Sequence, residues 1–228
     1  MNLDKYELAI FKKRLNQESS YLLGYEDFLK TGICILLLWQ EDEYHFVFQK
    51  RTMHISQGGE ICFPGGKKDP TDVDFLDTVL RETEEEMGIL QSKLEVIGPL
   101  GTLVTPAGIF VESFIVVAKV SSLEEMNINS EEVEFAFTIP VSYFVQNEPL
   151  VYNINIEMQP FEIDDQGKAK VLFPAKDFLG IPRSYTQPWS RNHKYPIYVY
   201  PLNPFQQETL WGLTAQLVYE FVKKLKKK

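Results

Sequence analysis

Cysteines are scarce in this sequence. The 228 residues include only Cys34 and Cys62, without a Cys-x-x-Cys spacing, so a framework of several disulfides is excluded. Both cysteines lie in apolar surroundings, and we expect buried free thiols in a reducing compartment. A disulfide or a nucleophilic cysteine is the minor alternative.

Long hydrophobic runs are also missing. No stretch approaches the roughly 20 apolar residues of a transmembrane helix. The best run, residues 33–39, has the length of a strand, and residues 1–5 lack the apolar core of a signal peptide. We therefore expect a cytoplasmic protein that is not bound to a membrane.

Positive charge is in deficit. The chain has 23 Lys and Arg against 32 Asp and Glu, a formal net charge of −9, which disfavours nonspecific binding to duplex nucleic acid. The lysines at 223–228 crowd the end, where they suit the C-terminus of a helix. A polyanionic substrate remains compatible with this charge if bound cations bridge the two sets of negative groups.

The hydrophobic pattern predicts one α/β domain over residues 1–228. Helical periodicity marks residues 4–16, 72–87 and 207–224, and extended patterns mark residues 32–39, 44–50, 61–63, 94–97, 101–104, 111–120 and 134–139. Strands mixed with flanking helices indicate an α/β/α sandwich with a mixed β-sheet. Prolines punctuate residues 151–201, which we expect to be strands and turns wrapping the domain rather than a substrate-facing flap.

A cluster of glutamates is the most informative feature. Glu82 and Glu86 lie one helical turn apart, with Glu85 beside them on the same arc. Three like charges on one face repel one another unless a cation binds among them, and carboxylate oxygens are the ligands that Mg²⁺ or Mn²⁺ prefers. The turn Gly65-Gly66 upstream would let the backbone approach a metal ion or a phosphate.

This segment resembles the Nudix box, Gly-x5-Glu-x7-Arg-Glu-U-x-Glu-Glu-x-Gly-U, where U is aliphatic. The second half of the box is matched by Arg81, Glu82, Glu85, Glu86, Gly88 and Ile89. Three positions differ: Thr83 replaces an aliphatic residue, Gly66 lies one residue early, and Val73 stands in the slot of the first glutamate.

The opening Gly65-Gly66-Lys67-Lys68-Asp69-Pro70 is similar to that of one Nudix subfamily, the coenzyme A diphosphatases. Residues 51–66 resemble a second signature of these enzymes, although Gln57 replaces its usual histidine. Glu132-Val133 and residues 210–215 resemble two further segments. In the last of these, we expect Trp211 to pack in the core.

The resemblance implies a metal site and a catalytic base. The implied metal ligands are Glu82, Glu85 and Glu86, with Mg²⁺ or Mn²⁺ as cofactor. Either Glu86 or Glu85 would also activate the attacking water, or Glu132 would do so from a distant loop, where Glu131 and Glu134 are its competing neighbours.

The remaining candidate residues would position the substrate or the ligands. Arg81 has two interpretations, a phosphate contact or an ion pair that holds a ligating carboxylate, and we favour the second. Gly65 and Gly66 would contact the ligand through backbone groups. Arg51 and Lys50 would bind substrate phosphates, with surface ion pairs as the alternative.

The resemblance implies hydrolysis of coenzyme A or its thioesters to adenosine 3′,5′-bisphosphate and a 4′-phosphopantetheine compound. The same carboxylates would suit another nucleoside diphosphate derivative, such as ADP-ribose or NADH, because they contact only the diphosphate. A Nudix-fold ligand sensor without catalysis is the third interpretation, and the intact glutamates disfavour it. The expected partner is thus a small nucleotide, and a homodimer is compatible with the family.

Overall fold

The computed structural model describes residues 5–15, 22–189, 194–203, 205 and 208–227. Its body is built on a seven-stranded sheet in the order β3-β2-β1-β6-β5, with β4 also paired to β1 and β7 to β2. The pairing of β1 with β6 is parallel and the other pairings are antiparallel. The predicted mixed sheet is thus confirmed. Its strands are β1 (Leu29–Gln40), β2 (Glu43–Arg51), β3 (Ile61–Cys62), β4 (Gly65–Lys67), β5 (Leu94–Val104), β6 (Ile109–Ala118) and β7 (Val133–Pro140).

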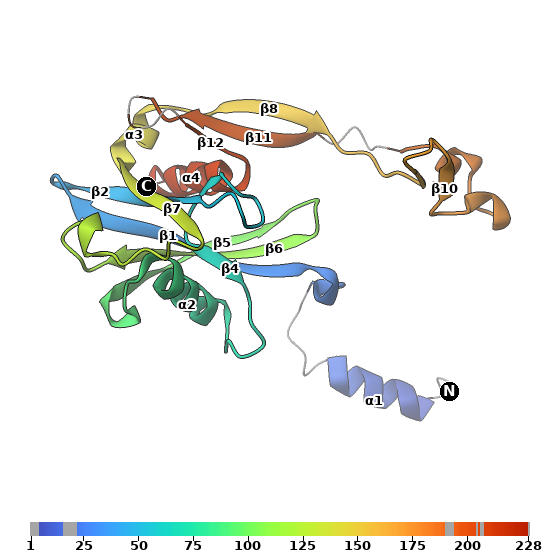
Figure 1. Cartoon of the computed structure of the whole chain (residues 1–228). Helices are drawn as coiled ribbons and strands as arrows, with labels where there is room; N and C mark the ends of the chain where they lie inside the picture. The colour runs from blue at the N-terminus through green and yellow to red at the C-terminus, as the bar shows by residue number, and fades with distance from the viewer. Residues whose placement is uncertain (1–4, 16–21, 190–193, 204, 206–207, 228) are drawn as a thin grey trace.

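Helices cover both faces of this sheet, as the α/β/α prediction requires. In Figure 1, α2 (Phe75–Met87) lies below the sheet, and α3 (Val141–Gln146) and α4 (Gly212–Leu225) lie above it. Strand β1 supplies both cores because successive side chains point to opposite faces. Ile35 and Leu37 lie in the core between the sheet and helices α3 and α4, whereas Leu36 and Leu38 lie in the core between the sheet and α2.

Helix α2 begins and ends at recognisable capping residues. The Asp74 side chain accepts a hydrogen bond from the Asp77 N–H, and Gly88 ends the helix with a φ of 65°. The predicted end is confirmed, but the predicted start at residue 72 was three residues early. The cause is that Asp74 takes the N-cap position, so the residues before it form a turn.

A second, three-stranded sheet has the order β12-β11-β8. The helix predicted for residues 207–224 begins only at Gly212, because residues 209–211 pair with β11 as a strand instead. The strands are β8 (Leu150–Asn155), β11 (Lys194–Pro201) and β12 (Thr209–Trp211). The predicted strands 94–97 and 101–104 are one strand, β5, interrupted by two register shifts.

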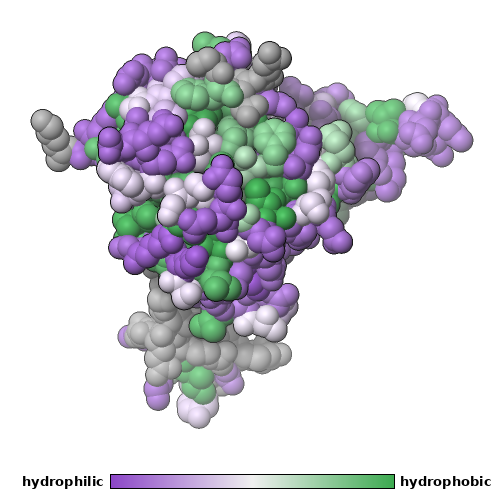
Figure 2. Space-filling model, turned by 60° about the vertical axis from the view of Figure 1, so that its left-hand side comes forward, coloured by the Kyte–Doolittle hydropathy of each residue, from purple (hydrophilic) through white to green (hydrophobic). Residues whose placement is uncertain are grey.

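Residues 156–189 form an arm that projects from the ends of β8 and β11, and they do not wrap the domain (Figure 1). The arm contains the hairpin β9 (Phe161–Ile163) and β10 (Ala169–Val171). Figure 2 shows the arm at the upper right, and hydrophobic side chains in patches among hydrophilic ones on the body. At the other end of the chain, α1 (Lys5–Leu15) lies away from the body.

The described helices are all too short or too polar to cross a membrane. Both cysteines are free, as predicted. Burial raises the pKa of the Cys34 thiol to about 12 and that of the Cys62 thiol to about 11. Thiols with such pKa values stay protonated at neutral pH, which makes them poor nucleophiles.

Candidate functional site

A cavity of about 530 Å³ lies where the glycine turn meets α2. It brings together carboxylates, a guanidinium group and glycine backbone from separate parts of the chain. The predicted site residues in its wall are Arg51, Gly65, Gly66, Glu82, Glu86 and Glu132. The first residues of α4 also line the cavity, so the C-terminal helix contributes to its wall.

Gly65 and Gly66 begin strand β4 against β1, and each leaves space that a Cβ would fill. A Cβ on Gly65 would lie 2.3 Å from the Gly32 carbonyl oxygen, and φ at this residue is 149°. A Cβ on Gly66 would lie 2.4 Å from Cδ of Glu82. The glycines therefore leave the space that the Glu82 carboxylate occupies.

Glu86 is the most buried carboxylate of the site. Its exposed fraction is 1%, and its Oε2 accepts a hydrogen bond of 2.9 Å from the Gly65 N–H. Its Oε1 lies 3.5 Å from Nη1 of Arg51. Burial raises the pKa of Glu86 to about 7, against the lowering effect of the Gly65 N–H and Arg51.

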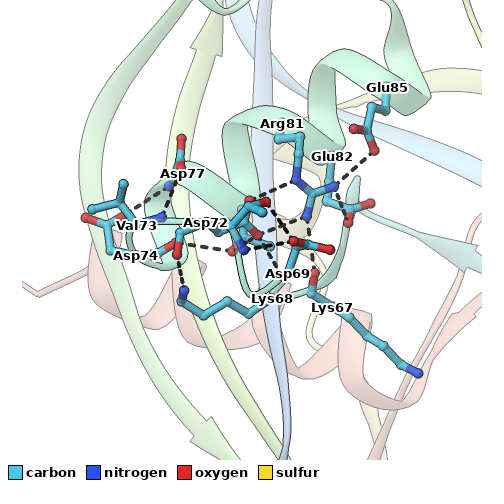
Figure 3. Close-up of polar contacts among 12 residues, drawn as sticks. Lys67, Lys68, Asp69, Asp72, Val73, Asp74, Asp77, Arg81, Glu82 and Glu85 are labelled. Atoms are coloured by element: carbon cyan, nitrogen blue, oxygen red, sulfur yellow. Dashed lines mark hydrogen bonds and ion pairs between the residues drawn. The ribbon is translucent and has the colours of Figure 1, made fainter.

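Arg81 links the glutamates of α2 (Figure 3). Its Nη1 donates to Glu82 Oε1 at 2.9 Å and to Glu85 Oε2 at 3.0 Å. Its side chain is not part of the cavity wall. Of the two interpretations of Arg81, this geometry is that of an ion pair holding the carboxylates in place.

Asp72 anchors Arg81 from the other side, and the sequence pattern did not reveal it. Its Oδ1 accepts from Arg81 Nε at 2.9 Å, and its Oδ2 accepts from Nη2 at 3.0 Å. Oδ2 also accepts from the Asp69 N–H and the Thr78 hydroxyl. Counting back from Arg81 places Val73 in the acidic slot, but leaving five residues after Gly66 places Asp72 there. The extra residue of this box thus lies between Asp72 and Arg81.

Glu85 differs from Glu82 and Glu86, the other two predicted metal ligands on α2. Its side chain is 54% exposed and is held by Arg81, and it is absent from the residues that line the cavity. Its assignment as a metal ligand or base stays a prediction. In this structure, Glu82 and Glu86 are the two glutamates of α2 that face the cavity.

Glu132 reaches the same cavity from the turn before β7. This turn is fixed against Thr52, whose N–H donates to the Glu132 carbonyl at 2.9 Å and whose hydroxyl donates to the Glu131 carbonyl at 2.9 Å. Of the three neighbouring glutamates considered from the sequence, Glu132 lines the cavity and Glu131 and Glu134 do not.

Arg51 and Lys50 lie at the end of β2 with different surroundings. Arg51 is in the cavity wall, where its guanidinium is the cationic neighbour of Glu86. Lys50 lines an adjoining cavity of about 500 Å³, and its Nζ lies 2.5 Å from Oε1 of Glu208. Substrate binding by either residue stays a prediction.

Trp211, which was expected in the core, is found in a different environment. Its side chain is 48% exposed and lies in the walls of both cavities, so it is not a core residue. Its position follows from β12, in which alternate residues face opposite sides: Leu210 is fully buried, and Trp211 faces outward. Gln57, the replacement for the usual histidine, also lines the main cavity.

The donor set suits a hard divalent cation, because it consists of carboxylate oxygens. Within the described ranges, no three His, Cys, Asp or Glu side chains are already gathered as a metal centre. Arg81 instead occupies the space between Glu82 and Glu85. The fit is supported by Glu82, whose pKa is raised by burial, and by Glu86 beside it. A buried and a partly buried carboxylate in one cavity are stabilised in their charged forms by a bound cation.

The chain is similar in sequence to several known proteins. The chain is 33% identical over 131 residues to a peroxisomal coenzyme A diphosphatase of Mus musculus, covering 54% of this chain and 51% of that protein. It is 38% identical over 92 residues to a mitochondrial coenzyme A diphosphatase of Homo sapiens, covering 40% and 38%. It is 36% identical over 122 residues to Nudix hydrolase 3 of Caenorhabditis elegans, covering 52% and 50%. The chain thus spans about half the length, or less, of these curated relatives.

Among solved structures, an Ap4A hydrolase binary complex of C. elegans aligns with a TM-score of 0.43 at 15% identity, covering 51% of this chain and 83% of that one. The sequence model of the NUDIX domain matches residues 29–153, which is more than half of the 228 residues. This segment contains β1 to β7, α2 and the carboxylates of Asp72, Glu82, Glu85, Glu86 and Glu132. The chain therefore belongs to the NUDIX domain family.

Proposed function

We propose that this protein is a metal-dependent diphosphate hydrolase whose substrate is coenzyme A or one of its thioesters. The observation that carries the proposal is the cavity in which Glu82, Glu86 and Glu132 meet beside Arg51 and the glycine turn. The substrate assignment is supported by the two coenzyme A diphosphatases among the relatives. Water would attack one phosphorus of the diphosphate and break the P–O–P bridge, giving adenosine 3′,5′-bisphosphate and 4′-phosphopantetheine or its acyl derivative.

A divalent cation, Mg²⁺ or Mn²⁺, would be held by Glu82 and Glu86, with Glu85 as the further predicted ligand. When bound, such an ion neutralises diphosphate oxygens and acidifies a water molecule. The chain itself supplies the positioning. The Gly65 N–H and Arg51 fix the Glu86 carboxylate, and Arg81 fixes Glu82.

Glu132 is suited to accept the proton of the attacking water. It lies in the same cavity as the α2 carboxylates but comes from the turn before β7. It can therefore face the substrate from a different side. General bases must lie within hydrogen-bond reach of the proton that they take. Arg51 would offset the negative charge of the diphosphate at the cavity wall.

The test is a substrate panel. The purified full chain is incubated with Mg²⁺ or Mn²⁺ and with coenzyme A, acyl-coenzyme A, ADP-ribose or NADH, and the products are identified by mass. We expect coenzyme A compounds to be cleaved with the highest kcat/KM. Preferred cleavage of ADP-ribose or NADH would overturn the substrate assignment. Binding without cleavage of any compound would overturn the enzyme assignment in favour of a ligand sensor.

A further inference from the structure

Strand β8 is an uncovered edge of the three-stranded sheet. It pairs with β11 on one side, and no described residue pairs with its other side. All six of its residues are exposed. The large apolar residues among them are each about half exposed, namely Leu150, Val151, Tyr152 and Ile154. An open edge strand with apolar side chains on both faces readily pairs with another strand.

The register shows which amides face this open edge. Asn153 lies opposite Pro196 in the antiparallel pair. Opposed residues in such a pair exchange two N–H···O bonds or none, and proline has no N–H to give. The Asn153 N–H therefore points away from β11, and the alternation of the ladder turns Val151 and Asn155 the same way. The edge thus presents three amides in a row to an incoming strand.

We propose that two copies of this chain form a dimer by antiparallel pairing of their β8 strands about a two-fold axis. A row of backbone donors and acceptors is best satisfied by another strand. A two-fold axis sets each segment against its own copy, so a charged edge would repel itself. Residues 150–155 carry no charge, although the chain as a whole carries −9. The edge is therefore compatible with its own copy and offers nothing to attract a basic partner.

The arm gives this pairing the area that it needs. A six-residue strand edge is too small for a stable interface, which buries about 1,200–2,000 Å² in total. Residues 156–189 continue from the end of β8 away from the body (Figure 1). Antiparallel pairing would place each arm beside the body of the partner. The arm carries exposed apolar side chains that this contact would cover: Val171, Leu172, Phe178 and Leu179.

The test is the mass of the full chain in solution, measured by sedimentation equilibrium over a wide concentration range. We expect a dimer for the wild type and for Asn153→Ala, which keeps the amide. Asn153→Pro removes the outward N–H without removing a hydrogen bond to β11 and should weaken the dimer roughly ten-fold or more. Circular dichroism and thermal unfolding check that the proline variant is folded.

Amide hydrogen exchange in the wild type tests the same pairing without a variant. Exchange at Val151, Asn153 and Asn155 should slow as protein concentration rises, whereas Tyr152 and Ile154, which face β11, should change less. A monomeric wild type, a dimer that Asn153→Pro leaves intact, equal weakening by both variants, or exchange independent of concentration would each overturn the proposal. The acidic cavity contains no residue of β8, so these outcomes are separate from the hydrolase assignment.

Discussion

Glu86 and Glu84 lie two residues apart on α2 but in different environments. Glu86 is buried in the cavity wall, and Glu84 is partly exposed and outside it. We predict that Glu86→Gln lowers kcat/KM for diphosphate hydrolysis by at least about 100-fold. The reason is that an amide keeps the shape of the side chain but not the charge that binds a cation. Steady-state kinetics of the purified variant measure the effect.

Glu84→Gln is the matched control for this prediction, and its kcat/KM should stay close to that of the wild type. Both variants should unfold within a few degrees of the wild type, because neither changes side-chain volume. Near-normal turnover by Glu86→Gln would remove Glu86 from the set of metal ligands.

Asp72 is predicted to stabilise the fold through Arg81. Asp72→Asn removes the anionic partner of the guanidinium and should lower the free energy of unfolding by about 1–3 kcal/mol at neutral pH. Arg81 would then hold Glu82 less firmly, so half-maximal activity should need more Mg²⁺. Urea unfolding and a magnesium titration measure the two effects. Asp69→Asn is the control for both, because Asp69 forms no hydrogen bond or ion pair with Arg81 and its asparagine keeps an oxygen for Thr71.

The stability effect should depend on pH with a definite sign. The Arg81 guanidinium holds the pKa of Asp72 well below its usual range. A carboxyl group with a lowered pKa contributes stability above its unfolded-state pKa of about 3.9 and loses it as the pH falls toward the folded-state value. The difference between wild type and Asp72→Asn should therefore be full at neutral pH and shrink below about pH 4. A difference that is constant with pH would contradict the ion pair.

At this scale the sequence predicts those contacts that follow from helical spacing. The contact of Arg81 with Glu85 is such a case, because residues four positions apart lie on the same face of a helix. The contact of Arg81 with Glu82, the next residue, does not follow from this spacing. Asp72 lies before the helix, where direction depends on the turn, and its contact with Arg81 could not be predicted from spacing. The prediction that Trp211 is a core residue was wrong for a similar reason. The direction of its side chain depends on whether residue 211 is in a helix or a strand.

Among the elements, β4 allows two steric effects to be separated. Gly65→Ala would drive a Cβ against the Gly32 backbone, and we predict a loss of about 2 kcal/mol or more in the free energy of unfolding. Gly66→Ala meets only the end of the Glu82 side chain, which can move. It should cost less stability but at least about ten-fold in activity. Thermal unfolding and kinetics of both variants test the contrast.

Gly101→Ala is a matched control for the backbone torsion. Gly101 has a φ of 151°, close to that of Gly65, but a Cβ added there would meet no atom within 4 Å. Its substitution should therefore show the conformational cost without the clash. Normal activity in Gly66→Ala would show that the position of Glu82 is not critical.

The elements of the body could largely be predicted, and those at its margins could not. Alternation and helical periodicity give β1, β2 and α2 because these elements bury one face or both in a core. Residues 209–211 follow neither rule strongly, and their strand forms only because β11 lies alongside. The pairing of distant strands is not visible in a local pattern.

For the whole molecule, we predict that α4 unfolds together with the domain that precedes it. Phe221 of α4 packs on Phe46 of β2 with ring centroids 4.9 Å apart. Phe221→Ala should therefore lower the free energy of unfolding by about 3–5 kcal/mol. Leu225→Ala, at an exposed position on the same helix, should change it by less than about 0.5 kcal/mol. Chemical denaturation followed by two probes measures both variants.

A single transition for both probes would support the prediction of one domain over the body of the chain. Two separate transitions would show that α4 folds independently of the sheet. The arm was the part of the molecule least accessible from sequence, since proline spacing indicates interruptions but not the direction in which a hairpin projects.

The position of the extra residue in the box has a consequence for how such chains are found. It lies between Asp72 and Arg81, a stretch that contains the Asp74 cap and the first turns of α2. An insertion ahead of this cap would leave the angular phase of every later residue unchanged, which agrees with the position of Glu82 and Glu86 beside the glycine turn. Search patterns with a fixed distance from acid to arginine would overlook chains of this kind. A pattern that lets this one gap vary would recover them and keep their chemistry.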